Sequence, residues 1–216
     1  MRQVYLCSTV VAAFLTAITV MTPAAKAEDC SEAVLAAVAK QRSSKAFRVA
    51  LTQETAEGPV DMTVDYMPPD RMLQTVVGKH MPGPQQTMLV GARAFAGTNG
   101  SYEELLPHFA QSIVAEFATA ISKPTNIGQF DCAGKQTFEG KEYLAYRARD
   151  KDAKPDANPD EVMARTIYVD PDNGLPAYNV VAAMSGKGEP QFKVTYSYPT
   201  DVVIEAPEGA PVQKSP

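Results

Sequence analysis

Alternation of apolar and polar residues predicts β-strands in two long parts of the chain, residues 46–98 and 142–198. The clearest stretch is Val60 to Tyr66, where every second residue is apolar and Asp61, Thr63 and Asp65 lie between. A period of two places the apolar side chains of a strand on one face. We therefore expect strands at 46–54, 60–66, 71–77, 85–91, 92–98, 142–149, 192–198 and on both sides of a turn at 170–174.

Two segments have the pattern of helices instead. Residues 31–44 are rich in alanine, with Val34, Leu35 and Val38 on one side and Ser31 as the expected cap. The second helix is predicted by an apolar residue at every fourth position, and Ser101 and Glu104 before it fit a capping box. Its stripe consists of Phe109, Ile113, Phe117 and Ile121, and Lys123-Pro124 ends it.

Short turns join neighbouring strands, and this constrains the architecture. Antiparallel strands can be joined by a few residues, whereas parallel strands need a long crossover. The inventory of about ten strands and two helices thus predicts an α+β fold, with the helices laid on one large, strongly curved antiparallel sheet.

The first 27 residues have the plan of a secretory signal peptide. Arg2 precedes an apolar run from Val10 to Val20, and the segment ends in Ala25-Lys26-Ala27, an A-x-A cleavage pattern. An anchor that is never cut is the alternative. We expect a cleaved signal at 1–27, a single periplasmic domain at 28–207 and a flexible tail at 208–216. The net charge of −5, which removal of Arg2 and Lys26 makes more negative, argues against nucleic acid as a partner.

Two cysteines remain after the signal peptide, which contains Cys7, is removed. Cys30 and Cys132 can pair in only one way, and an oxidising compartment favours a structural disulfide. A redox-active pair is the alternative, but the C-x-x-C spacing is missing.

Residues able to carry out catalysis are scarce. The two histidines, His80 and His108, have no partners at metal-ligand spacing, and no nucleophile elbow or phosphate-binding glycine loop is present. Asp61 and Asp65 belong to the polar face of a strand. We therefore expect no catalytic residue, no metal site and no cofactor, and a protein that is not an enzyme.

The alternating apolar residues are the candidate site. They form either one wall of a closed core or the lining of a hollow that holds an apolar guest. Methionines suit a variable guest, although they also fill ordinary cores. The strand residues expected to line the hollow are Val49, Leu51, Met62, Val64, Tyr66, Met72, Met88, Phe95, Leu144, Tyr146, Ile167, Phe192, Val194 and Tyr196.

Four blocks, in order, resemble the periplasmic lipoprotein-carrier (LolA-like) superfamily, which includes the mycobacterial lipid-binding proteins LppX and LprG. The blocks are "VDYMPPDRMLQTVV", "QQTMLVGARAFAGTNGSYEEL", "RTIYVDPDNGLPAYNVV" and "VTYSYPTDVVIEAP", and they span much of residues 46–207. The resemblance implies an unclosed half-barrel whose concave face is capped by helices and holds acyl chains without chemistry. Phe109, Ile113 and Phe117 would then cover the hollow.

The resemblance also implies a role for Arg71, as a contact between sheet and lid, although a plain salt bridge or turn contact fits as well. Two features differ from the family. Phe95 and Tyr102 take the place of a frequent tryptophan, and a Cys30–Cys132 bond would restrict opening.

The expected partners are a lipid or acylated lipoprotein and an envelope acceptor protein, bound by a monomer. The alternative is a structural or interaction protein whose own side chains fill the hollow.

Overall fold

A computed structural model describes residues 28–148 and 158–214, so the expected signal peptide lies outside the described part. The described chain forms one antiparallel sheet of eleven strands and two helices, which confirms the α+β class with one strand more than expected. The elements are α1 (Ser31–Arg42), β1 (Phe47–Thr55), β2 (Gly58–Met67), β3 (Arg71–Gly78), β4 (Gln85–Val90), β5 (Arg93–Thr98), β6 (Ser101–Glu104), α2 (Pro107–Ile121), β7 (Phe130–Phe138), β8 (Lys141–Ala148), β9 (Met163–Val169), β10 (Pro176–Ala183) and β11 (Phe192–Ser197).

Two meanders make up the sheet, whose strand order is β6-β5-β4-β3-β2-β1-β11-β10-β9-β8-β7. Each strand pairs with its neighbour in sequence, except that the first strand meets the last at the centre. There Arg48 to Leu51 pair with Ser197 to Val194. The outer strands β6 and β7 are not paired with each other, so the sheet is an unclosed half-barrel.

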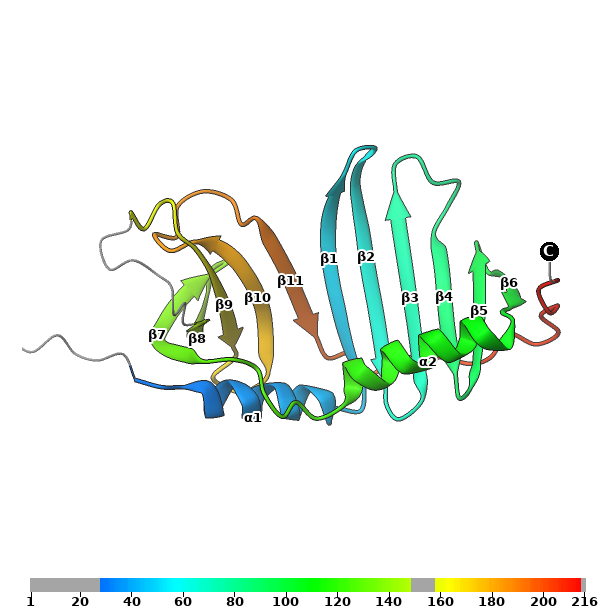
Figure 1. The fold of residues 1–216 in the computed structure, drawn as a ribbon, viewed down its shortest axis with the longest axis horizontal. Coiled ribbons are helices and arrows are strands. Elements are labelled where there is room, and N and C mark those ends of the chain that lie inside the picture. Colours follow the sequence, from blue (N-terminus) through cyan, green and yellow to red (C-terminus); the bar gives the residue numbers. More distant parts are fainter. Residues whose placement is uncertain (1–27, 149–157, 215–216) are drawn as a thin grey trace, which may run out of the picture.

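Both helices lie on one face of the sheet, here called the helix face (Figure 1). Helix α2 crosses the β1–β6 half and α1 lies over the β7–β11 half. The registers place Val49, Val64 and Tyr196 on the same face, because Val49 of β1 pairs with Val64 of β2 and with Tyr196 of β11. The residues between them in sequence point to the opposite face.

The predicted start of the second helix is wrong. Ser101 to Glu104 form β6, an edge strand paired with Thr98 to Phe95, and the helix begins only at Pro107. Leu106 occupies the N-cap position without a side-chain hydrogen bond. The Ser-x-x-Glu pattern therefore does not form a capping box, since a proline at the first helical position sets the start of the helix instead.

Ser31 is also not the cap of its helix. Asp29 Oδ1 accepts hydrogen bonds from the Ser31 backbone N–H at 3.0 Å and from its hydroxyl at 2.6 Å. The Ser31 Oγ in turn accepts from the Phe130 N–H at 2.9 Å, which ties the start of α1 to β7.

Segments near the two chain ends cover the two edges of the sheet. Beside β7, Cys30 N–H donates to Phe130 O at 2.8 Å and Cys132 N–H donates to Glu28 O at 3.0 Å. Beside β6, Glu104 N–H donates to Pro211 O and Gln213 N–H donates to Glu104 O, both at 2.8 Å. An exposed edge strand is a template for unwanted pairing, and these contacts occupy part of each edge strand.

The β7–β10 end of the sheet is strongly bent. Phe138 of β7 lies 4.6 Å from Tyr168 of β9 and 5.0 Å from Tyr178 of β10, measured between ring centroids. Neighbouring strands are about 4.8 Å apart, so rings two and three strands away meet only across a bent sheet. This bend forms the curved half of the half-barrel.

Candidate functional site

The apolar stripe of α2 packs directly on the helix face of β2–β5. Ala110 and Phe117 of α2 form one buried cluster with Val64, Met72 and Leu89 of the sheet. The side chains around this cluster are apolar and partly buried: Met62, Tyr66, Leu105, Ile113, Val114 and Ile121. Six of the residues expected to line or cover a hollow, Phe117 among them, therefore meet here, and α2 occupies the space above the sheet.

Phe109, the first residue of the predicted stripe, is 48% exposed and contacts His108, with ring centroids 4.1 Å apart. Ala110 is buried in that turn instead. An α-helix turns about 100° per residue, so a repeat of four drifts by about 40° at each step. A stripe centred on Phe117 therefore leaves Phe109 at the edge of the packed face.

Helix α2 is held at both ends by polar contacts. Before the helix, Leu105 N–H donates to Ala94 O at 2.8 Å. After it, the Arg42 guanidinium at the end of α1 donates to Ser122 O. A cation at a helix C-terminus also interacts favourably with the helix dipole. Arg42 therefore links the two helices that cover the sheet.

A second apolar cluster lies under α1. Val34 and Ala37 of the helix pack against Phe130, Ile167 and Val169. Leu144 and Tyr146, two further residues of the expected lining, border this cluster. The expected lining is thus divided between the two helices.

Between the clusters lie the helix-face residues of β1 and β11. Val49 pairs with Tyr196 and Leu51 with Val194. Burial raises the pKa of Tyr66 and of Tyr196, so both phenols stay neutral at physiological pH. The strip that joins the two halves is therefore largely uncharged on the helix face.

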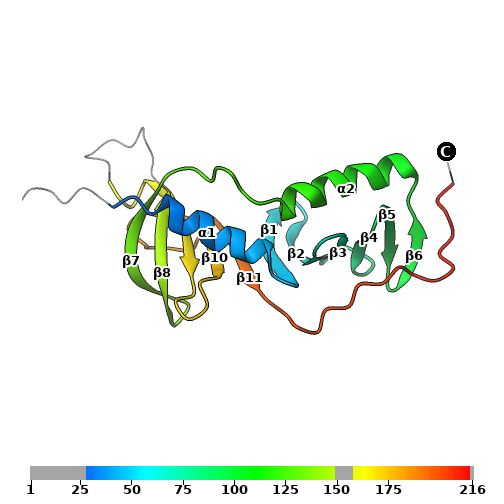
Figure 2. The ribbon, with the colours of Figure 1, turned by 90° about the horizontal axis from the view of Figure 1, so that it is seen from below.

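Met88 and Phe95 do not belong to this face. They pair with Leu73 and with each other on the opposite face, where they surround the buried Ile204. Residues 202–214, here called the C-terminal strap, cross this face on the side away from α2 (Figure 2). The expectation that both residues line the common hollow is wrong, because the position of each residue in its strand, not apolarity, determines the face.

Arg71 also points to the strap. Its Nη1 donates to Ile204 O at 2.9 Å, and its Nε lies 4.0 Å from Asp70 Oδ1. The contact that was expected with a lid is therefore made with the C-terminal strap. The alternation of Val202, Ile204 and Ala206 in the sequence is the signal that could have predicted this packing.

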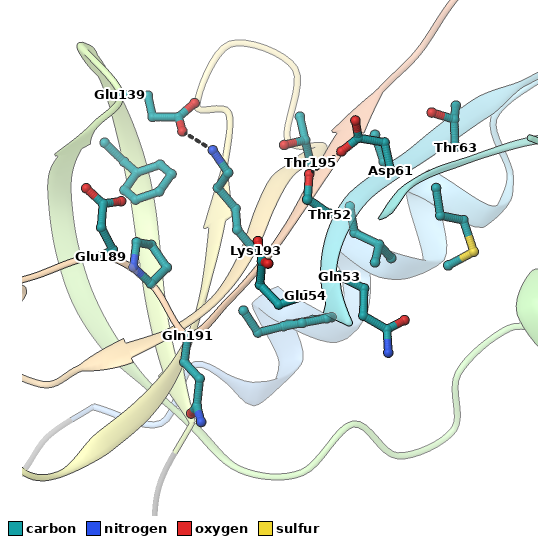
Figure 3. Close-up of a pocket in the computed structure, with 16 residues that line it drawn as sticks. Thr52, Gln53, Glu54, Asp61, Thr63, Glu139, Glu189, Gln191, Lys193 and Thr195 are labelled. Atoms are coloured by element: carbon teal, nitrogen blue, oxygen red, sulfur yellow. Dashed lines mark hydrogen bonds and ion pairs between the residues drawn. The ribbon is translucent and has the colours of Figure 1, made fainter. Parts of the chain in front are cut away.

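An open cavity of about 1120 Å³ lies where the ends of β1 and β2 approach β11 and the β7–β8 turn (Figure 3). Three of the expected residues, Leu51, Met62 and Phe192, line it. The other lining side chains are mainly polar, and four of them are carboxylates: Glu54, Asp61, Glu139 and Glu189.

One cation, Lys193, lines the cavity and is already paired. Its Nζ lies 2.5 Å from Glu139 Oε1, and this contact lowers the pKa of Glu139. Asp61 accepts a hydrogen bond from Thr52 Oγ1 at 2.6 Å. The four carboxylates distinguish this cavity from the purely apolar hollow that was expected.

No group of three or more His, Cys, Asp or Glu residues in the described parts is placed to hold a metal ion. None of the helices described here is long and apolar enough to cross a membrane. Cys30 and Cys132 form a disulfide with Cα atoms 5.3 Å apart, which agrees with the predicted pairing.

No family model and no curated protein sequence matches the chain. Solved structures do overlap with it. LprF from Mycobacterium bovis is 13% identical, with 82% of this chain and 98% of that chain covered and a TM-score of 0.47. MucB in complex with MucA(peri) is 11% identical over 86% of this chain and 62% of that chain, with a TM-score of 0.46. A LolA superfamily protein, NE2245 from Nitrosomonas europaea, is 10% identical over 77% of this chain and 91% of that chain, with a TM-score of 0.29.

All three TM-scores are below 0.5, so these overlaps support no statement about function. The fold assignment is based instead on the sheet topology of this chain. Its unclosed antiparallel sheet with two helices on one face has the half-barrel architecture that the sequence resemblance implied.

Proposed function

We propose that this chain is a non-catalytic binding protein of the periplasm, which holds the acyl chains of a lipid or lipoprotein on the helix face of its sheet. The observation that carries the proposal is the apolar floor of Val64, Met72 and Leu89, which is covered by the single helix α2. Export would be directed by residues 1–27, and an envelope acceptor would receive the guest.

A guest would replace the apolar stripe of α2 over the floor. Burial of a methylene group is worth about 0.8 kcal/mol, whether the group belongs to a side chain or to an acyl chain. The exchange of one apolar cover for another therefore costs little, and the closed packing is compatible with binding. The contacts of Leu105 and Arg42 at the two ends of α2 would set how readily the helix moves away.

Two matched substitutions test the position of the guest. Val64→Phe adds bulk to the floor under α2, whereas Val77→Phe makes the same change on the opposite face of β3, where Val77 is exposed. We expect native mass spectrometry of the mature protein, after incubation with a fatty acid or phospholipid, to show a bound lipid. Val64→Phe should lose it and Val77→Phe should keep it. Circular dichroism of both variants checks that they remain folded.

The alternative is an interaction protein with a self-filled core, and the close packing of Ala110 and Phe117 on the sheet favours it. Phe117→Ala separates the two functions, because it removes the largest side chain of the cover. A carrier should then take up lipid more readily than the wild type. A mass that stays free of lipid in both proteins would support the interaction protein and contradict the carrier.

A further inference from the structure

A second cavity, of about 460 Å³, lies on the face opposite the helices in the β7–β10 half of the sheet. The register places Arg147 of β8, Thr166 of β9 and Val180 of β10 side by side on this face. Gln136, Thr137, Tyr168 and residues 182–186 complete much of the lining. The cavity is thus separate from the acyl-chain surface under α2, and a ligand bound in it would be independent of the proposed function.

Arg147 is the unusual residue of this cavity. Its Nε atom is buried and has no hydrogen-bond partner, and no salt bridge of Arg147 occurs within residues 28–148 and 158–214. Every other arginine in these two ranges has a partner: Arg42 with Ser122, Arg48 with Asp65, Arg71 with Ile204, Arg93 with Glu104 and Arg165 with Asn179. A buried donor without an acceptor costs free energy, and more so when it is charged.

The nearest acid in the pairing pattern is Asp131 of β7, which lies in register with Arg147. Asp131 has an interaction of its own and is not part of the cavity lining. The remaining lining side chains carry no charge. Among the described residues, the guanidinium is therefore the single charged group that faces this cavity.

The neutral polar groups around Arg147 are suited to an anion. Thr137 and Thr166 carry hydroxyls, and the Gln136 amide carries two N–H groups, one of which donates to Ala133 O at 3.4 Å. The Ser185 hydroxyl is already bonded to Asp160, whose pKa it lowers. Burial raises the pKa of Tyr168, so its phenol keeps its proton and can donate. A planar guanidinium binds carboxylate and phosphate groups through parallel hydrogen bonds, and cavities of about 300–1,000 Å³ are the usual size for small molecules.

We propose that this cavity binds the oxyanion of a small polar molecule, either a phosphoryl or a carboxylate group, with Arg147 as the residue that pairs with the charge. The hydroxyl and amide groups around Arg147 form hydrogen bonds with the rest of the ligand, as donors or as acceptors. The buried Nε–H belongs to the same guanidinium group, so its NMR signal should respond when an oxyanion pairs with that group.

The Nε–H of Arg147 is itself the best probe of this proposal. In ¹⁵N-labelled mature protein, its NMR signal should shift and saturate on titration with at least one of inorganic phosphate, glycerol 3-phosphate and acetate. Sodium chloride at the same ionic strength is the control for screening. The absence of a saturable shift with all three soluble probes would overturn the proposal.

Arg147→Gln and Arg165→Gln form a matched pair, because Arg165 lies on the neighbouring strand but is already bonded to Asn179. We expect Arg147→Gln to weaken binding of the effective probe at least about tenfold, by calorimetry, and Arg165→Gln to leave it unchanged. Equal binding by wild type and Arg147→Gln would contradict the assignment.

Thermal unfolding gives a second readout, which also detects a variant that fails to fold. The effective probe should raise the Tm of the wild type and leave the Tm of Arg147→Met unchanged, since only the native guanidinium is proposed to bind it.

Vesicles of phosphatidylglycerol distinguish a lipid headgroup from a soluble molecule. Binding to vesicles without binding of any soluble probe would overturn the proposal as stated.

Discussion

Phe117 of α2 and Tyr66 of β2 stack with their ring centroids 6.1 Å apart, and Tyr66 stacks in turn on Phe47 of β1 at 4.8 Å. This row of three rings joins the second helix to the central strands of the sheet. Phe117 is 3% exposed and Phe47 is equally buried. The row is therefore the main aromatic contact of α2 with the sheet.

Phe117→Ala is expected to lower the free energy of unfolding by about 3–5 kcal/mol, because it removes a buried ring and leaves a cavity. Hydrogen exchange should quicken in α2 more than in α1, which packs on a different cluster. Urea unfolding and exchange mass spectrometry measure the two effects. A loss below about 1 kcal/mol would contradict a tightly packed α2.

Ile204 and Val203 are neighbours in the C-terminal strap, but their exposed fractions are 1% and 72%. We expect Ile204→Ala to cost about 2–5 kcal/mol, whereas Val203→Ala should stay within about 0.5 kcal/mol. Ile204→Ala should also increase the fluorescence of a dye that binds apolar surface, since Met88 and Phe95 lie beneath the strap. Similar effects of the two substitutions would show that the strap is not held against the sheet in solution.

The disulfide between Cys30 and Cys132 closes a loop with a sequence separation of 102 residues. Replacement of both cysteines by serine should lower the free energy of unfolding by up to about 4.7 kcal/mol, the chain-entropy value for a loop of this length. Hydrogen exchange should quicken at the backbone amides of positions 30 and 132, which bind Phe130 and Glu28. A reducing agent should have the same effect on the wild type and none on the double variant.

Asp170 gives the stability a dependence on acid pH. Lys141 donates to its Oδ2 at 2.7 Å, and this hydrogen bond lowers the pKa of Asp170. A lowered pKa stabilises the folded state above the unfolded value of about 3.9, and this contribution is lost as the pH falls through the folded pKa. The difference in unfolding free energy between wild type and Asp170→Asn should therefore shrink at low pH.

Asp172→Asn, in the same turn, is the matched control for this pH effect. Its side chain has no ion pair among the described residues, so Asp172→Asn leaves the ion pair of Asp170 with Lys141 in place. NMR titration of the carboxyl signals measures the pKa directly. An Asp170 pKa at or above the unfolded value would contradict the role of Lys141.

The alternation in the sequence was sufficient to predict most of the strands. Val60 to Tyr66 lies within β2, and the predicted hairpin turn at 170–174 connects β9 and β10. These predictions succeed because strand periodicity is local and because short turns require antiparallel neighbours. Two of the eleven strands lie outside the predicted ranges: β6, whose residues 101–104 also fit a helix-capping pattern, and β7 (Phe130–Phe138).

The arrangement of the site was less predictable, since it depends on contacts between distant residues. Alternation divides a strand into two faces but does not say which face a distant helix covers. Met88 and Phe95 were therefore grouped with Val64, although the strap covers them. The lack of a partner at the Arg147 Nε likewise depends on the positions of other strands and has no signal in the sequence.

The pairing of Arg48–Leu51 with Val194–Ser197 has a consequence for the order of folding. Each meander consists of hairpins between neighbouring segments, so it can form from contacts that are local in sequence. The central seam joins the first strand to the last, so it requires contact between residues about 145 positions apart. Formation of non-local pairs is slow, and we expect closure of this seam to be the slowest step of folding apart from disulfide formation.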